Sequence, residues 1–243
     1  MGRLHEGYDL GRMALGICPR RARSILSSRF LSETDEGPSK AIAVRKRDLV
    51  IKLQTIQPHP RPKVALEQYT VPADLAAEIL FRACYVHDDI EGKSVLDLGT
   101  GTGRLVLGAS ILGAEYAIGV DLDHSALEVA AENCGRLGLQ IDLVLGNIEA
   151  LRGAVDTVVM NPPFGTKRAH ADIHFLEVAL RLANVIYSIH KSSTRSHLGR
   201  WLTQHHTNSD IIISSRMEIP HQFSFHTKRR QYVNVDVYRI VHS

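Results

Sequence analysis

From Arg45 onward, short apolar runs alternate with segments in which apolar residues recur every three or four positions. The short runs, bounded by turn residues, predict buried strands, and the wider spacing predicts amphipathic helices. This alternation is typical of a parallel sheet that is covered by helices on both faces. The expected strands are residues 94–98, 116–121, 141–145, 155–160 and 185–190, and the expected helices are residues 73–85, 104–112, 125–136, 172–184 and 194–201.

The last part of the chain departs from this alternation. Residues 211–219 and 232–241 are two strand-like segments joined by a proline-containing connection, without a helical pattern between them. Strands joined without a crossover helix pair antiparallel. The predicted fold is therefore α/β, with a Rossmann-like sheet of seven strands that is mostly parallel and ends in an antiparallel C-terminal hairpin.

Residues 1–45 lack this periodicity and are rich in Arg and Ser, without an acidic residue between Leu10 and Ser32. A transit peptide or a mispredicted start would also fit this composition. The early acidic residues Glu6 and Asp9, and the lack of a clear cleavage signal, favour disorder instead. We therefore predict a disordered N-terminal extension, residues 1–45, and one folded domain, residues 46–243.

Composition adds limits to this picture. An apolar content of 44% and a charged content of 23% fit a soluble globular domain with a sizeable core. The three cysteines, Cys18, Cys84 and Cys134, are widely spaced and odd in number, so they predict neither a disulfide framework nor a metal site. A reducing compartment is expected, in the cytoplasm, the nucleus or both.

The charges are segregated along the chain. Residues 1–69 hold 13 Lys and Arg against 7 Asp and Glu, and residues 185–243 hold 8 against 3. Between them, residues 70–184 hold 8 against 16. Basic segments on both sides of an acidic middle suggest a polyanionic partner such as nucleic acid, although an ordinary solvated surface is an open alternative.

A glycine-rich turn follows the first expected strand, in the segment VLDLGTGTGRL. Gly99, Gly101 and Gly103 allow the backbone to approach a ligand closely, and the helix that follows exposes free N–H groups. Asp121 ends the next strand, where a carboxylate can accept hydrogen bonds from two ribose hydroxyls. The pattern predicts a cofactor that contains a nucleoside.

Two residues indicate which cofactor. Arg104 stands where a dinucleotide fingerprint requires a small residue, and Asp97, before the glycines, would repel a pyrophosphate. A carboxylate there suits a cationic ligand, such as the amino group and sulfonium of S-adenosylmethionine, which we predict as the cofactor. Asn147, after the third expected strand, is placed near the adenine ring, although a loop asparagine is also a common turn former.

The segment MNPPFGTK follows the fourth expected strand. Because adjacent prolines neither continue a helix nor donate to a sheet, Pro162 and Pro163 form a stiff turn with a free carbonyl. The Asn161 side-chain oxygen and the Pro162 carbonyl can hold both hydrogens of an exocyclic aromatic amine, while Phe164 stacks on the base. These residues predict methyl transfer to a base amine, with rate acceleration from positioning and dipoles. The alternative is a tight turn that ends in a buried Phe.

The glycine turn and the NPPF segment together resemble the amino-methyltransferases that modify adenine N6. The resemblance narrows to the methyltransferase-like protein 5 family, which are ribosomal-RNA adenine-N6 methyltransferases, through four segments in order: LEQYTVPADLA (66–76), MNPPFGTK (160–167), YSIHKSSTR (187–195) and FSFHTKRR (223–230). It covers the chain from about Lys46 onward. It implies a class I methyltransferase sheet in strand order 3-2-1-4-5-7-6, and small-subunit (18S) ribosomal RNA as substrate.

The resemblance also implies roles for single residues. Gln68 and Tyr69 would line the methionine end of the cofactor, and Val71 stands where related sequences often carry Thr. His190 would flank the base pocket, and Lys191 would lie near RNA phosphate. Further RNA contacts are expected at clustered basic residues: Lys167, Arg195, Lys228, Arg229 and Arg230.

A partner subunit is implied as well, because eukaryotic members of that family work with a small zinc-binding activator subunit. In the implied strand order, residues 141–145 form an edge strand with little charge to protect it. An added strand from the activator would cover this edge.

Other functions stay open from sequence alone. The NPPF segment also permits a DNA adenine-N6 or cytosine-N4 methyltransferase. A non-catalytic RNA-binding module on a methyltransferase fold is a third possibility, but such a module has no chemical reason to keep Asp97, Asp121 and Asn161 together.

Overall fold

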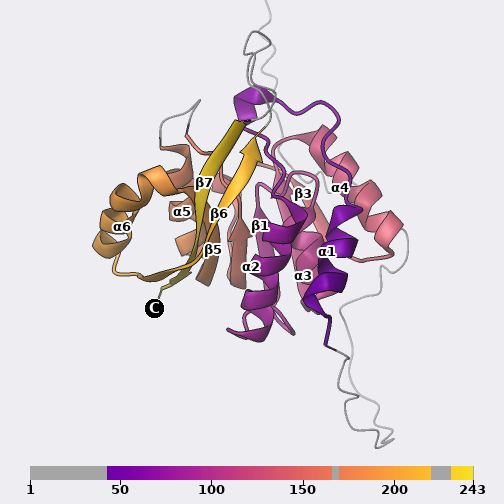
Figure 1. Ribbon diagram of the computed structural model, residues 1–243, viewed down its shortest axis with the longest axis horizontal. Coiled ribbons are helices and arrows are strands. Elements are labelled where there is room, and N and C mark those ends of the chain that lie inside the picture. The colour runs from indigo at the N-terminus through magenta and orange to yellow at the C-terminus, as the bar shows by residue number, and fades with distance from the viewer. Residues whose placement is uncertain (1–42, 166–169, 220–230, 243) are drawn as a thin grey trace, which may run out of the picture.

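The computed structural model describes residues 43–165, 170–219 and 231–242 (Figure 1). The extension expected at residues 1–45 therefore lies almost wholly outside the described residues and stays a prediction. Within the described part, no helix combines the length and apolar character that a membrane-crossing helix needs.

Seven strands form one sheet in the order β3-β2-β1-β4-β5-β7-β6, which confirms the fold class and strand order predicted from the sequence. The parallel part consists of β1 (Ser94–Leu98), β2 (Tyr116–Asp121), β3 (Asp142–Leu145), β4 (Val155–Met160) and β5 (Ala183–Lys191). The antiparallel part is β6 (Asn208–Ile219) and β7 (Gln231–Val241), and β7 pairs with β5.

Helices cover the sheet on both faces, as expected from the alternation in sequence (Figure 1). One hydrophobic cluster joins the sheet to α1, α2 and α3 with part of α4, and a second joins it to α5 and α6. The helices are α1 (Lys46–Gln54), α2 (Ala73–Tyr85), α3 (Arg104–Ile111), α4 (His124–Leu137), α5 (Ala171–Leu182) and α6 (Arg195–Gln204). Three short 3-10 turns connect them: η1 (Val64–Leu66), η2 (Ile148–Ala150) and η3 (Ser192–Thr194).

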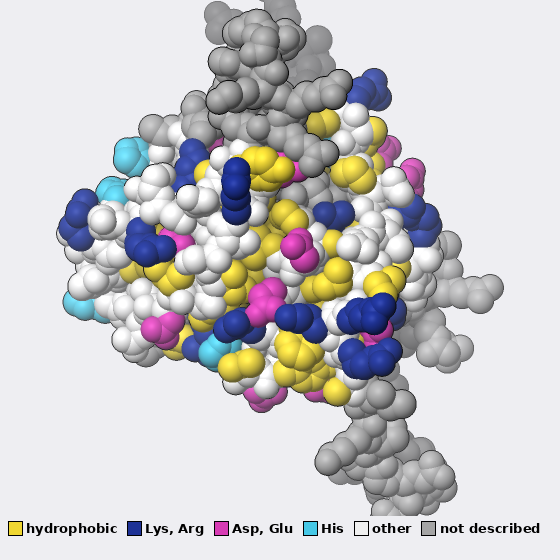
Figure 2. Space-filling model, in the orientation of Figure 1, with side chains coloured by type: hydrophobic (Ala, Val, Ile, Leu, Met, Phe, Trp, Pro, Cys, Tyr) yellow, Lys and Arg dark blue, Asp and Glu magenta, His cyan; other side chains and the backbone are white. Residues whose placement is uncertain are grey.

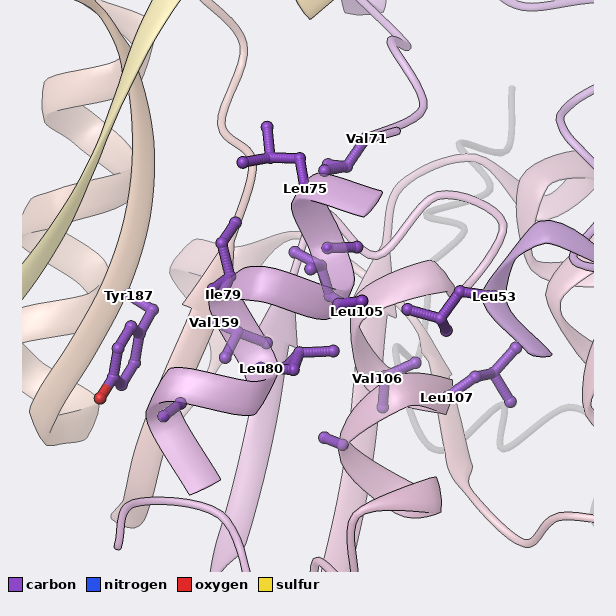
Figure 3. Packing of buried hydrophobic residues seen from close by; sticks show 14 of the residues in the cluster. Leu53, Val71, Leu75, Ile79, Leu80, Leu105, Val106, Leu107, Val159 and Tyr187 are labelled. Atoms are coloured by element: carbon purple, nitrogen blue, oxygen red, sulfur yellow. The ribbon is translucent and has the colours of Figure 1, made fainter. Parts of the chain in front are cut away.

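Alternate residues of the central strands serve the two clusters, because successive side chains of a strand point to opposite faces. Val95 of β1 and Val159 of β4 pack toward α2 and α3, and Figure 3 shows Val159 beside Leu80. Leu96 and Val158 belong to the cluster under α5. Each fully buried side chain of this size contributes about 1.5–3 kcal/mol relative to an exposed one, so the central strands form a stiff base for the loops above them.

The structure differs from the expected elements in two places. The sequence pattern did not predict α1, whose charged composition leaves only Leu49 and Leu53 buried. The helix expected at residues 172–184 ends at Leu182, and Ala183 begins β5 without a loop because it pairs with Val155 of β4.

Residues 55–72 connect α1 to α2 and are called the cover segment below. This segment passes over the carboxyl ends of the parallel strands, at the top of Figure 1. Its residues 65–71 form one wall of a cavity at that end of the sheet. The cover segment thus brings residues that precede the sheet in sequence against its functional edge.

Candidate active site

A cavity of about 550 Å³ lies at the carboxyl ends of β1, β2 and β4. Open α/β sheets bind ligands at this edge, where the strand order reverses, and here the reversal falls between β1 and β4. The cavity has the size of a small-molecule site. Residues singled out from the sequence line much of it: Gln68, Tyr69, Asp97, Gly99, Gly101, Asp121, Asn147, Asn161 and Pro163.

The glycine turn supplies the backbone conformation that the sequence predicted. Gly99, Gly101 and Gly103 have φ angles of 71°, 55° and 88°, in the left-handed region that favours glycine. Gly99 and Gly101 line the cavity, whereas Gly103 does not. A Cβ on Gly103 would lie 3.3 Å from the Cβ of Ala130, so this glycine permits helix packing, and its contact with the cofactor stays a prediction.

Asp97 lies at the floor of the cavity with 1% of its surface exposed. Its Oδ2 accepts hydrogen bonds from the Thr100 hydroxyl at 2.7 Å and from the Val106 N–H at 3.2 Å. Burial raises the pKa of Asp97 to about 7 despite these donors, and the Asp121 carboxylate adds to the rise. A positively charged ligand group would offset the unfavourable burial of this carboxylate.

Asp121 ends β2, as predicted, and each of its oxygens already accepts a hydrogen bond from a backbone N–H group. Oδ2 accepts from the Gly101 N–H and Oδ1 accepts from the Asp123 N–H, each at 2.8 Å. Burial raises its pKa. Because each carboxylate oxygen has a second acceptor site, contacts with ribose hydroxyls remain compatible with this arrangement.

The sequence analysis missed Asp123, which holds the cover segment. This residue is 3% exposed and accepts from Lys63 Nζ at 2.7 Å, Gln68 Nε2 at 2.8 Å and the Ser125 hydroxyl at 2.7 Å. Burial acts to raise its pKa, but these hydrogen bonds outweigh burial and hold the pKa well below the usual range. Gln68 was predicted to contact the cofactor, but its side-chain Nε2 donates a hydrogen bond to Asp123 instead.

Arg104 provides a second connection to the cover segment. Its Nη1 donates to the Val71 carbonyl at 2.6 Å and its Nη2 donates to the Ile56 carbonyl at 2.9 Å. Arg104 also lines the cavity. The sequence had indicated only that this side chain is too large for a dinucleotide turn.

Asn161 follows β4 and faces the cavity with its amide in a defined orientation. Its Nδ2 donates to the Tyr69 carbonyl of the cover segment at 3.0 Å. Since a carbonyl can only accept, the Asn161 oxygen must point the other way. That oxygen, Oδ1, is buried and has no hydrogen-bond partner among the described residues.

Only part of the remaining NPPF segment reaches the cavity. Pro163 lines the cavity, but Pro162 and Phe164 do not. Phe164 is 6% exposed, with the Tyr69 ring centroid 5.9 Å away and Lys191 Nζ 5.6 Å from its own centroid. Phe164 thus packs against the Tyr69 ring, and this arrangement does not provide the predicted stacking of a base on Phe164.

Asn147 confirms the turn-forming alternative that the sequence left open. Its Oδ1 accepts from the Glu149 N–H at 3.1 Å and caps η2, while Nδ2 donates to the Glu149 carboxylate at 3.2 Å. It also lines the cavity, so its predicted place near the adenine ring stays a prediction.

His190 is not available to RNA, which corrects its predicted role. The residue is 1% exposed, its Nε2 lies 2.7 Å from the Ser188 hydroxyl, and its Nδ1 lies 3.5 Å from Asp172. Arg195, also expected at the RNA, binds the buried Asp236 carboxylate through Nε and Nη2 at 2.9 and 2.8 Å. Lys191, at the end of β5, is half-buried. Four further predicted RNA contacts lie outside the described residues: Lys167, Lys228, Arg229 and Arg230.

Figure 2 shows basic and acidic side chains interspersed over the face that carries α1 and α2. In residues 43–165, 170–219 and 231–242, no three His, Cys, Asp or Glu side chains are grouped to hold a metal ion. Cys84 and Cys134 are both buried in the core.

Comparison with similar proteins indicates which kind of reaction this cavity serves. Residues 83–162, which include the glycine turn and Asn161, match a family model described as ribosomal protein L11 methyltransferase (PrmA). A protein of Pyrococcus horikoshii, described as a proposed RNA methyltransferase, has a solved structure that matches with a TM-score of 0.75 and 40% identity. The match covers 82% of this chain and 98% of that one.

Two relatives have more specific names. The chain is 38% identical over 204 residues to the Drosophila melanogaster protein named rRNA N(6)-adenosine-methyltransferase Mettl5, covering 81% of this chain and 96% of that protein. It is 34% identical over 203 residues to the Danio rerio protein named rRNA N(6)-adenosine-methyltransferase METTL5, covering 81% and 98%.

Proposed function

Because this chain belongs to the METTL5 family of rRNA N(6)-adenosine-methyltransferases, we propose that it methylates an adenine N6 in small-subunit (18S) ribosomal RNA and that Asn161 holds the reacting amine. The enzyme uses S-adenosylmethionine, which supplies an electrophilic methyl group on a positively charged sulfur. The choice of the small subunit rests on the resemblance of four sequence segments, and the role of Asn161 rests on its geometry.

The cavity fits this cofactor by charge as well as by size. Asp97 is a buried carboxylate with a raised pKa, and the ammonium and sulfonium of the cofactor would offset the unfavourable burial of its charge. Asp121 offers acceptors to ribose hydroxyls at the end of β2. Asn147 and Ile148 line the cavity beyond β3, where an adenine ring would lie.

One observation supports the reaction above all others, the buried and unpartnered Oδ1 of Asn161. Leaving a buried acceptor without a hydrogen bond costs about 1–3 kcal/mol. Such an acceptor at the wall of a ligand cavity is suited to a donor that arrives with the substrate. The exocyclic amine of adenine is a donor of this kind.

Hydrogen bonds that hold the amine would also make it a better nucleophile. The lone pair of an exocyclic aromatic amine is delocalised into the ring, so the amine is a poor nucleophile. A hydrogen bond from the amine to Asn161 Oδ1 would favour tetrahedral nitrogen and turn the lone pair toward the methyl group. Because positive charge develops on the nitrogen during transfer, this acceptor stabilises the transition state more than the ground state. The Pro162 carbonyl, the second acceptor predicted from the sequence, does not line the cavity and stays a prediction.

The direct test is methyl transfer from labelled cofactor to purified 18S rRNA, 28S rRNA, DNA and protein in parallel. The proposal expects label in 18S rRNA and N6-methyladenosine as the modified nucleoside, identified by mass spectrometry after digestion. Asn161→Ala should remove this product. Label chiefly in DNA or protein, or a different modified nucleoside, would contradict the proposal.

A partner is part of the same proposal. We propose that a small zinc-binding activator subunit adds a strand to β3. Support comes from the sheet, in which β3 is an edge strand with Val144 40% and Leu145 36% exposed. An uncovered apolar edge of this kind promotes aggregation, so a covering subunit would also stabilise the protein.

The partner is tested by co-purification after a charge is placed on this edge. Val144→Lys is more selective than Leu143→Lys, because Leu143 is half-buried and its Cδ2 would lie 3.1 Å from a Cβ on Gly119. Ile211→Lys on β6, the opposite edge, is a matched control, since Ile211 is 38% exposed. The proposal expects Val144→Lys alone to lose the activator. Equal retention by both variants would place the activator elsewhere.

A further inference from the structure

Arg104 is a half-buried cation in the wall of the cavity, and burial lowers its pKa. Its Nε atom is buried and has no hydrogen-bond partner among the described residues. In the described part of the chain no carboxylate forms an ion pair with it, and its two hydrogen bonds go to neutral carbonyls of Val71 and Ile56. A buried charge is ordinarily paired with an opposite charge. Arg104 therefore lies in the cavity wall without a counter-ion among the described residues.

The opposite charge lies in the same cavity without touching Arg104. Asp97 is 1% exposed and accepts from Thr100 and from the N–H of Val106 in the first turn of α3. Arg104 begins that helix, so one short segment places a buried carboxylate and a half-buried guanidinium in one cavity without pairing them. A ligand that carries both a positive and a negative group would satisfy both charges.

The position of Arg104 indicates which part of the cofactor it meets. Its bond to the Val71 carbonyl places it against the same stretch of the cover segment in which the Tyr69 carbonyl binds Asn161. Asp121 and Asn147, at the ends of β2 and β3, belong to the nucleoside side of the cavity. Arg104 therefore lies on the methionine side.

We propose that Arg104 binds the carboxylate of the cofactor's methionine moiety, so that Arg104 and Asp97 together recognise its zwitterionic end. Guanidinium and carboxylate form strong, charge-assisted hydrogen bonds. Val71 has no side-chain hydroxyl to offer this carboxylate, and Arg104 reaches the cavity beside it. The inference rests on S-adenosylmethionine being the cofactor.

Calorimetry with two ligands tests this role without measuring catalysis. S-adenosylmethionine and its decarboxylated form share the sulfonium and the ammonium and differ only in the carboxylate. The full-length wild-type protein is expected to bind the carboxylated form about 10- to 150-fold more tightly, the range for one hydrogen-bonded charged group. Arg104→Gln should abolish this preference by weakening only the carboxylated ligand, and Arg104→Lys, which keeps the charge, should retain part of it.

Arg136→Gln is the matched control. Arg136 Nη2 also donates to a carbonyl of the cover segment, that of Thr55 at 2.9 Å, but Arg136 does not line the cavity. Its loss should leave the ligand preference unchanged. This comparison separates ligand recognition from support of the cover segment.

Three results would overturn the inference. Arg104→Gln could weaken both ligands equally, which would show that Arg104 acts only by holding the cover segment. It could leave the preference intact, which would place the carboxylate elsewhere. If the variants fail to fold, a wild-type protein that binds both ligands with equal affinity also refutes it. Failure of the wild-type protein to bind S-adenosylhomocysteine would instead refute the cofactor assignment itself.

Discussion

The two walls of the cavity differ in how far their polar groups are satisfied. On the cofactor wall, Asp97 and Asp121 together accept four hydrogen bonds from the backbone and side chains of the protein, namely from Thr100, Val106, Gly101 and Asp123. On the substrate wall, Asn161 donates to the Tyr69 carbonyl, but its Oδ1 has no partner among the described residues.

This difference separates two ways of building a binding site. The cofactor wall is held by internal hydrogen bonds, so its shape is set before the cofactor arrives. The substrate wall keeps one acceptor unpaired, at a cost of about 1–3 kcal/mol, and that acceptor is satisfied only when a donor enters. Substitutions on the two walls should therefore affect different steps of the reaction.

The largest effect is expected from Asn161→Ala. Removing an acceptor that matters mainly as charge develops should lower single-turnover methyl transfer to an adenine-containing RNA by about 10²–10³-fold at saturating cofactor, comparable to the loss of one oxyanion-hole donor. Cofactor affinity should change little. Asn161→Asp, which keeps an acceptor, should retain more activity than Asn161→Ala.

Asn147→Ala serves as the control for this substitution, because Asn147 also lines the cavity but uses its amide on Glu149. Its single-turnover rate should stay close to that of the wild type. Near-normal turnover in Asn161→Ala would remove the contrast between the two walls.

On the cofactor wall, Asp121→Ala should act on binding. Loss of hydrogen bonds to a charged group weakens affinity by about 1.5–3 kcal/mol, or about 10- to 150-fold in Kd. The Gly101 and Asp123 N–H groups lose their acceptor too, so the glycine turn should loosen. Calorimetry should show weaker cofactor binding, whereas the rate at saturating cofactor should fall less than in Asn161→Ala. Unchanged affinity with an intact fold would contradict the assignment.

A change of pH should have a smaller effect, which falls on the affinity for the cofactor. Asp97 has a pKa of about 7 in the ligand-free protein, and a cationic ligand binds the ionised carboxylate. Cofactor affinity should therefore fall by up to about tenfold per pH unit below 7 and level off above it. Calorimetry between pH 5.5 and 8.5 would measure this, at about half-unit steps, and Asp97→Asn should flatten the profile.

The raised pKa of Asp97 also determines how the stability of the ligand-free protein changes with pH. Because the folded-state pKa of Asp97 is higher than its ordinary value of 3.8, folding favours the protonated acid. Its contribution to stability is therefore largest below pH 3.8 and is lost as pH rises through about 7. In the ligand-free protein, Asp97→Asn should remove this loss. A thermal melt of Asp97→Asn that declines with pH as steeply as the wild type would contradict the assignment.

The smallest functional effect is expected at Phe164. Because Phe164 packs against Tyr69 and does not line the cavity, Phe164→Leu, which removes three buried carbons, should lower stability by about 0.5–3 kcal/mol. RNA affinity, measured by titration, should stay near the wild-type value. A large loss of RNA affinity without loss of stability would restore the role of Phe164 as a stacking platform.

Much of the fold was predictable because local pattern and tertiary structure agree. The apolar runs of β1 and β4 are buried on both faces, so sequence alone marks them as central strands. Helix α1 was missed because two buried leucines in nine residues give a weak signal, and tertiary packing against α2 decides its conformation. The junction at Ala183 was misplaced because pairing with β4 outweighs local helix propensity.

The site was predictable where its residues follow strands directly. Asp97, Asp121 and Asn161 sit at or just after strand ends, and parallel strands bring such positions to one edge. Asp123 and Arg104 were not recognised, because their partners lie 33 to 60 residues away on the cover segment. His190 was assigned to RNA because a sequence does not reveal that β5 turns this side chain inward.

The place of β7 in the sheet has a consequence for synthesis of the protein. Strand β7 (Gln231–Val241) lies between β5 and β6, and its residues Val235, Val237 and Ile240 are fully buried. While a ribosome is still translating the segment before it, β5 has an open edge and both hydrophobic clusters lack side chains. The nascent chain can therefore close its sheet only after this late strand emerges, and until then its exposed strand edge is a target for chaperones.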